Sequence, residues 1–102
     1  ERFRIIVLEV HDVNYLTRPD PHLLMSQTFE KLNDLFVLTH VHPNNYTPVA
    51  RVAGWSIPPL LELTYIRRDR VSEIHPATAL PHPLDEANVA GKPDFSLPRY
   101  WQ

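Results

Sequence analysis

The first pattern in the chain is a short, continuous hydrophobic run. Residues 3–10 read FRIIVLEV, and positions 5–8 are four consecutive apolar side chains, three of them β-branched. A run of this kind is typical of a strand buried on both faces of a helix-covered sheet. Glu9, His11 and Asp12 come at its end, so we predict a buried strand whose carboxyl end carries polar side chains.

The second pattern is helical. Asp20 and Pro21 form a favourable helix start, because Asp can cap free backbone amides and Pro is tolerated at the first helical position. Beyond them, apolar side chains recur at spacings of four, three and four, which predicts an amphipathic helix over residues 21–34. The stripe consists of Met25, Phe29, Leu32 and Phe36, widened by Thr28 and Leu35.

Two further strands are expected. Residues 36–42, FVLTHVH, stop at Pro43, and residues 60–67, LLELTYIR, place Leu61, Leu63 and Tyr65 on one face. The pattern of residues 49–55 fits either a short strand or a loop. The intervening helix implies a parallel crossover between the first two strands. The third strand follows a loop without a helix, so it should run antiparallel to the second.

The last third of the chain has no regular period. Residues 68–102 contain five prolines and neither a helical nor a strand pattern. We therefore expect a single α/β domain with a β-α-β-β unit over residues 1–70 and an irregular, proline-rich tail over residues 71–102 that packs on it. Trp55, Tyr100 and Trp101 are expected to cover the sheet. The chain enters its first apolar run within two residues, from which we expect a fragment of a longer protein.

Composition excludes several functional classes. The 102 residues suit one small domain, and ten Lys and Arg against twelve Asp and Glu give a net charge of −2. That balance predicts neither nucleic-acid binding nor attraction to an anionic membrane. No apolar run approaches the roughly 20 residues of a membrane span. The absence of cysteine excludes disulfides and thiolate chemistry and leaves the compartment undetermined, with the cytoplasm as the expected location.

Glycine is equally restrictive. Gly54 and Gly91 are the only two glycines and lie far apart in the sequence. The chain therefore contains neither a dinucleotide-binding fingerprint nor a glycine-rich phosphate-binding loop. We therefore expect no cofactor-binding residues in this chain.

Polar side chains follow two of the predicted strands. Glu9, His11 and Asp12 end the first strand, and the carboxyl ends of parallel strands are where α/β sheets bind ligands. His11 and Asp12 suit a general base with an orienting carboxylate, although they equally suit a polar loop cap. The group at the end of the second strand consists of His40, His42, Asn44 and Asn45.

The two histidines of the second strand have alternative interpretations. His40 and His42 are two residues apart on a strand and share a face, so with Asp12 or Glu9 they could form an open zinc or iron site. The structural alternative is one buried and one exposed histidine. Asn44 and Asn45 follow Pro43, a pattern of turn chemistry, and their amides also suit ligand binding.

Several strings together resemble a known family. IIVLEVHD, FEKLNDLFVLTHVHPNN and IPPLLELTYIRRD, in this order, are similar to the carboxyl-terminal part of FkbM-type methyltransferases. The family's motifs map onto Glu9 and His11, residues 29–32, residues 40–45 and residues 62–65. Val10 stands where the family has an aromatic residue. The similarity covers roughly residues 3–70.

The resemblance implies the carboxyl-terminal part of a class I, Rossmann-like sheet, in which the last strand inserts antiparallel between its two predecessors. It implies transfer of a methyl group from S-adenosylmethionine to a small-molecule acceptor, with a hydroxyl oxygen as the expected target. The cofactor loop would lie upstream, so the implied partner is the cofactor-binding half of the same protein, and the chain alone is expected to be inactive.

The resemblance and the strand ends together suggest roles for individual residues. His11 and Asp12 are the expected catalytic pair. The expected acceptor-binding residues are Glu9, His40, His42, Asn44 and Asn45. Two alternatives remain: a metal-binding module built on His40, His42 and Asp12, and a non-catalytic interaction module that docks its proline-rich tail on a partner.

Overall fold

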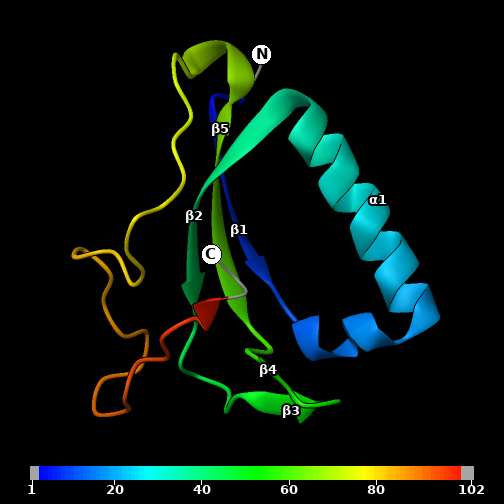
Figure 1. Cartoon of the computed structure of the whole chain (residues 1–102), viewed down its shortest axis with the longest axis vertical. Helices are drawn as coiled ribbons and strands as arrows, with labels where there is room; N and C mark the ends of the chain where they lie inside the picture. The colour runs from blue at the N-terminus through cyan, green and yellow to red at the C-terminus, as the bar shows by residue number, and fades with distance from the viewer. Residues whose placement is uncertain (1–2, 100–102) are drawn as a thin grey trace.

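The computed structural model describes residues 3–99 and contains five strands, one α-helix and two short 3₁₀ helices (Figure 1). In chain order these are β1 (Ile5–Val10), η1 (Val13–Thr17), α1 (Pro19–Leu35), β2 (Phe36–Pro43), β3 (Ala50–Val52), β4 (Trp55–Ile57), β5 (Leu61–Arg67) and η2 (Arg68–Arg70).

The main sheet has three strands in the order β1–β5–β2, and β5 runs antiparallel to both neighbours. β1 and β2 are therefore parallel to each other. The predicted strand order and the antiparallel third strand are confirmed, as is the α/β class. The ladder pairs Leu8 with Leu63 on one side and Val41 with Leu63 on the other. A bulge interrupts β2 between Leu38 and His40.

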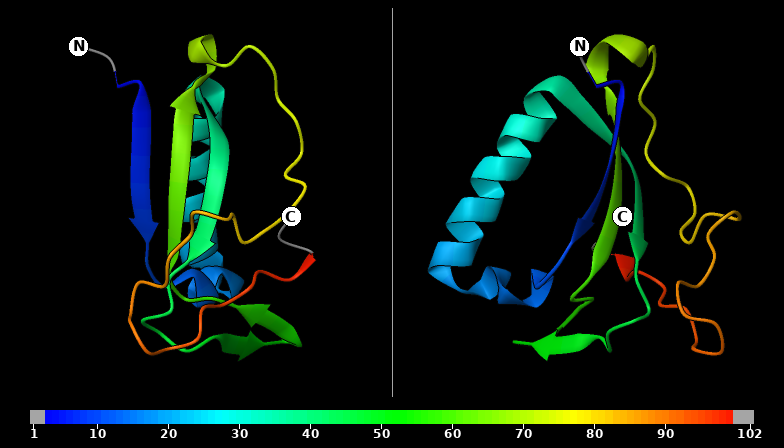
Figure 2. Two further views of the ribbon diagram at one scale, coloured as in Figure 1. Left: turned by 90° about the vertical axis from the view of Figure 1, so that its left-hand side faces the viewer. Right: turned by 180° about the vertical axis from the view of Figure 1, so that it is seen from behind.

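Different layers cover the two faces of the sheet. α1 leans against one face, and the irregular tail runs past the other, as the views from three sides agree (Figures 1 and 2). The alternation predicted for β5 is confirmed, because Leu61, Leu63 and Tyr65 are buried at 5%, 5% and 2% exposure. These three side chains form the centre of the core, together with Val13, Phe36 and Leu97.

The prediction that the first strand is buried on both faces is wrong. Ile6 and Leu8 pack against the core, but Ile5 is 58% exposed and Val7 is 67% exposed. β1 is an edge strand, and the tail lies mainly toward β2 and the lower part of the sheet (Figure 2). The outward face of β1 therefore has no covering layer among residues 3–99.

The helix is longer than predicted and less buried. It begins at Pro19, with Arg18 as its N-cap and Asp20 inside the first turn, so the predicted capping role of Asp20 is wrong. It ends at Leu35 and passes directly into β2. No residue of α1 is fully buried. Of the predicted stripe, Met25, Phe29 and Leu32 are half-buried, Thr28 and Leu35 are exposed, and Phe36 belongs to β2.

Residues 49–55, whose pattern fits either a strand or a loop, form most of a small hairpin. β3 and β4 pair antiparallel, and the turn residues Ala53 and Gly54 have φ values of 50° and 85°. Two successive positive φ values are typical of the tight turns that match the twist of a hairpin. Trp55 is 53% exposed in this hairpin, so its predicted covering role is wrong, while Tyr100 and Trp101 lie outside the described residues.

The tail has no helix or strand over residues 71–98. Asn45 fixes it instead: its Nδ2 donates to the carbonyls of Val89 and Lys92, both at 3.2 Å, and its Oδ1 accepts from the Val89 amide at 2.8 Å. Within residues 3–99, the longest helix is α1, and no helix combines the length and apolar composition that a bilayer crossing requires.

Candidate functional site

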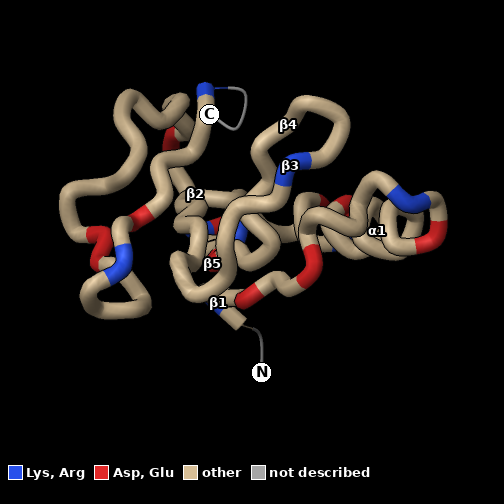
Figure 3. The backbone as a smooth tube through the Cα atoms, turned by 90° about the horizontal axis from the view of Figure 1, so that it is seen from below, with Lys and Arg blue, Asp and Glu red and all other residues tan. Residues whose placement is uncertain are grey.

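β5 connects the carboxyl ends of β1 and β2. In the ladder, Glu62 of β5 is the partner of Glu9 on one side and of His42 on the other. Three titratable side chains thus form one row across the sheet, near the end from which Figure 3 is viewed. Figure 3 shows acidic and basic positions interspersed along the chain.

Asn44 joins the two carboxylates of this row. It is 8% exposed, and its Nδ2 donates to Glu9 Oε1 at 3.1 Å and to Glu62 Oε1 at 3.3 Å. Its Oδ1 accepts from the Tyr46 backbone N–H at 2.9 Å. Sequence reasoning placed Glu9 and Asn44 at neighbouring strand ends, and the structure brings them into contact.

His42 links the row to the tail. The ring is 5% exposed, with Nδ1 3.5 Å from Glu62 Oε2 and Nε2 3.2 Å from Asp94 Oδ2. Burial by itself lowers the pKa of His42, but the hydrogen bonds to Asp94 and Glu62, with the negative charges of Asp94 and Asp85, outweigh it. The pKa of His42 is therefore raised, which favours the protonated ring that can donate to both carboxylates.

His40 contacts a different part of the tail. Its Nε2 lies 2.8 Å from Asp85 Oδ1, and its ring meets His82 edge-on at 5.9 Å. Because His40 and His42 bond separate carboxylates, they do not converge on one point. Residues 3–99 contain no group of three or more His, Asp or Glu side chains placed to hold a metal ion. The alternative metal site of His40, His42 and Asp12 is therefore not assembled.

The carboxylate that bonds His11 is Glu9 and not Asp12. His11 Nε2 lies 3.2 Å from Glu9 Oε2, and both side chains are open, at 66% and 46% exposure. Residues two apart on an extended chain point to the same side, whereas adjacent residues point to opposite sides. Asp12 instead has a left-handed backbone (φ 58°) at the start of η1, and its side chain makes no hydrogen bond to residues 3–99.

Three of the predicted acceptor-binding residues are bonded to the tail. The amide of Asn45 uses both its N–H donors and its oxygen on tail backbone, His40 is bonded to Asp85, and His42 is bonded to Asp94. The residues that remain accessible at the strand ends are Glu9 and His11.

Sequence reasoning missed four polar residues of this region. Glu62 is a lone acid in an apolar strand, which is a signal that the pattern offered. Asp85 and Asp94 are 45 and 52 residues away from their histidine partners, and no local pattern marks them. Asn88 donates to Glu62 Oε1 from the same tail.

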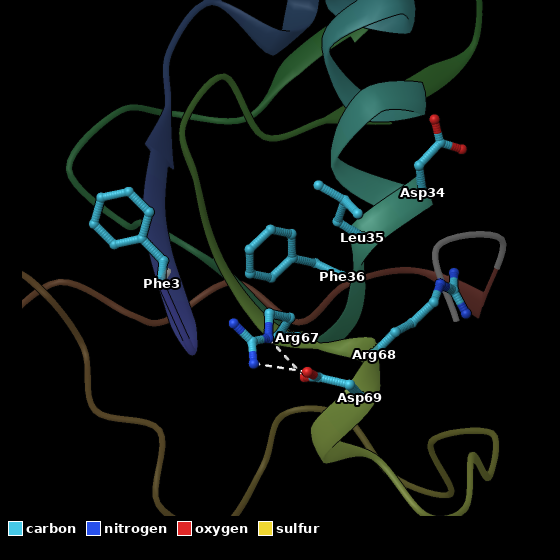
Figure 4. Close-up of a pocket in the computed structure, with 7 residues that line it drawn as sticks. All are labelled: Phe3, Asp34, Leu35, Phe36, Arg67, Arg68 and Asp69. Atoms are coloured by element: carbon cyan, nitrogen blue, oxygen red, sulfur yellow. Dashed lines mark hydrogen bonds and ion pairs between the residues drawn. The ribbon is translucent and has the colours of Figure 1, made fainter. Parts of the chain in front are cut away.

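Two hollows differ in their relation to this site. One, of about 280 Å³, lies between β1 and α1 and is lined by Glu9 and His11. The other, of about 590 Å³, lies at the opposite end of the sheet, around Phe3 and Phe36 (Figure 4). Figure 4 shows the guanidinium of Arg67 turned toward Asp69, its partner in two bonds of 2.6 Å. The smaller hollow is the one that adjoins the polar strand ends.

Comparison of the whole chain with protein-family models, with curated proteins and with solved structures gave no match in any of the three. The function is therefore argued from the geometry of the strand ends.

Proposed function

We propose that this chain is the acceptor-binding, carboxyl-terminal part of an FkbM-type methyltransferase with a class I, Rossmann-like sheet, which uses S-adenosylmethionine to methylate a hydroxyl oxygen. The observation that carries the proposal is the insertion of β5, antiparallel, between the parallel strands β1 and β2. The sequence resemblance implies the same arrangement. The polar residues of β1 and β2 also lie at the edge where α/β sheets bind ligands.

In this proposal His11 is the general base. The Glu9 carboxylate, 3.2 Å away, holds the ring and stabilises the imidazolium that forms when His11 takes the proton of the acceptor hydroxyl. The exposure of His11 leaves the ring accessible to an acceptor. When bound, the cofactor supplies an electrophilic methyl group, and the role of this chain is to orient and deprotonate the oxygen that receives it.

Residues 3–99 do not fit the cofactor itself. Gly54 lies in the β3–β4 turn and Gly91 in the tail, and neither opens a helix. A glycine-rich turn between a strand and a helix is what a nucleotide-type cofactor requires in such sheets. The proposal therefore assigns cofactor binding to an upstream half of the same protein.

The test uses the natural gene product that contains this chain. With S-adenosylmethionine and a panel of hydroxyl compounds, His11→Ala is expected to lower kcat/KM by roughly 10²–10⁴, the usual contribution of a general base. His22→Ala, on the exposed side of α1, is the matched control and should retain full activity. An unchanged kcat/KM in His11→Ala would remove His11 from the reaction.

A second measurement tests the division of labour. Calorimetry with the 102-residue chain alone is expected to show no tight binding of S-adenosylhomocysteine, whereas the gene product binds it. Tight binding by the chain alone would overturn the assignment of the cofactor to an upstream half.

A further inference from the structure

An apolar cavity lies between α1 and the sheet. It measures about 380 Å³ and is lined almost entirely by hydrophobic side chains. Because α1 leans on the sheet without burying any residue fully, a space separates Met25 and Phe29 of the helix from Leu63 of the sheet. Its other walls include Val10, Leu16 and Val41.

This cavity adjoins the hollow at His11. Val10, Met25 and Phe29 line both spaces, the inner one of about 380 Å³ and the outer one of about 280 Å³. The outer hollow is lined by Glu9 and His11. Leu8 and Val10 of β1 face α1, whereas Glu9 lies on the opposite face of the sheet with Glu62 and His42, so the apolar space reaches the Glu9–His11 pair at the edge of β1.

Tyr65 supplies an independent observation at the inner cavity. The residue is 2% exposed and lines the cavity, yet its hydroxyl makes no hydrogen bond to residues 3–99. Burial also raises the pKa of Tyr65, as expected for a phenol away from water. Buried hydroxyl groups nearly always have a partner, and one without a partner is destabilising. A ligand with a polar atom inside the cavity would provide that partner.

We propose that the wedge between α1 and the sheet binds the largely apolar body of the acceptor, which carries one polar atom opposite the Tyr65 hydroxyl, and that the acceptor is an amphipathic hydroxyl compound whose reacting oxygen lies at His11. The choice of acceptor rests on the proposed function. The volume falls within the roughly 300–1,000 Å³ of small-molecule sites. Leu61 and Tyr65, four residues apart on β5, mark a length of about 13 Å.

The dimensions favour a small molecule over a segment of protein. Its volume of about 380 Å³ lies at the lower end of the range of small-molecule sites, and α1 and the sheet of the same domain bound it on two sides.

The experiment uses the 102-residue chain and the neutral, lipophilic fluorophore N-phenyl-1-naphthylamine. We expect saturable binding, with amide chemical-shift changes at Val10, Phe29 and Leu63. Met25→Trp fills the passage shared by the two hollows and is expected to weaken binding at least tenfold. Leu23→Trp, on the same helix but 58% exposed and outside both hollows, should leave the dissociation constant within about twofold.

A further control separates the cavity from the bare face of β1. Val7→Ser reduces the apolar surface there and should leave probe binding unchanged, because Val7 is 67% exposed and lines neither hollow. If Met25→Trp does not fold, competition decides instead: 1-dodecanol should displace the probe from the wild-type chain and shift the same amides. Absence of saturable binding, binding unaffected by folded Met25→Trp, or loss of binding in Val7→Ser would each overturn the inference.

Failure of the inference and failure of the proposed function look different. If the probe binds in the wedge but the gene product methylates no hydroxyl compound, the cavity stands and the proposed function fails. If the gene product methylates only polar acceptors and the probe does not compete with them, the function stands and the amphipathic acceptor is wrong.

Discussion

Replacement of His42 tests how the tail is held. In His42→Ala, Asp94 and Glu62 lose the ring that lies between them, at 3.2 Å and 3.5 Å. A hydrogen bond to a charged group contributes about 1.5–3 kcal/mol, and the longer of the two is at the geometric limit. The carboxylates are 30% and 34% exposed, so rehydration offsets part of the loss. We expect the free energy of unfolding to fall by about 2 kcal/mol, or about 8–16 °C in Tm.

The effect should depend on pH in a defined direction. The folded pKa of His42 is raised, so its contribution is fully present below the unfolded pKa of about 6.5 and is lost as pH rises through the folded pKa. The difference in unfolding free energy between wild type and His42→Ala should therefore be largest in mildly acidic buffer and should narrow as pH rises.

The assay is urea unfolding followed by circular dichroism across a pH series. His75→Ala is the matched control. Like His42, His75 bonds a carboxylate, but its partner Glu73 is only two residues away and the His75 side chain is 77% exposed. We expect it to stay within about 0.5 kcal/mol of wild type. The reasoning would be refuted if His42→Ala matched this control, or if its difference from wild type did not narrow with rising pH.

Three further substitutions probe other parts of the fold. Asn45→Ala removes the bonds to Val89 and Lys92 and should cost about 2–3 kcal/mol at roughly 1 kcal/mol each; limited proteolysis should then cut the tail first. Tyr65→Phe removes a buried hydroxyl without a partner among residues 3–99, so urea unfolding should show equal or greater stability, whereas a loss above about 1 kcal/mol would reveal a missed bond. Gly54→Ala meets no atom within 4 Å but keeps φ +85°, so thermal unfolding should show a cost of about 1 kcal/mol from the backbone alone.

Much of the sheet could be predicted from local pattern. Three strands, the helix between the first two and the buried face of β5 all follow from the spacing of apolar side chains. The strand order came from the resemblance, because nothing in the alternation of residues 60–67 states which neighbours they pair with. Burial of β1 was predicted wrongly, since an apolar side chain such as Val7 is buried only where another layer covers it.

The candidate site likewise combines contacts that a local rule predicts with contacts that depend on the strand order. Glu9 and His11 meet because residues two apart on an extended chain share a side, which is a local rule. The expected pairing of Asp12 with His11 is not seen, because the backbone of Asp12 is left-handed at the start of a 3₁₀ helix and Glu9 bonds His11 instead. Glu62 could have been suspected as a lone acid in an apolar strand, but its contact with Asn44 needed the strand order.

The sequence by itself determined the three main strands and the helix, the polar character of the strand ends, and the absence of cysteine and glycine-rich motifs, because composition, periodicity and turn chemistry act over a few residues. The tertiary structure alone decided that His42 is held by Asp94 and that Asn45 is bonded to the tail. It also decided that α1 leaves a cavity against the sheet, lined by Tyr65. These features join residues tens of positions apart or depend on how two elements tilt, and no local pattern encodes a contact of that kind.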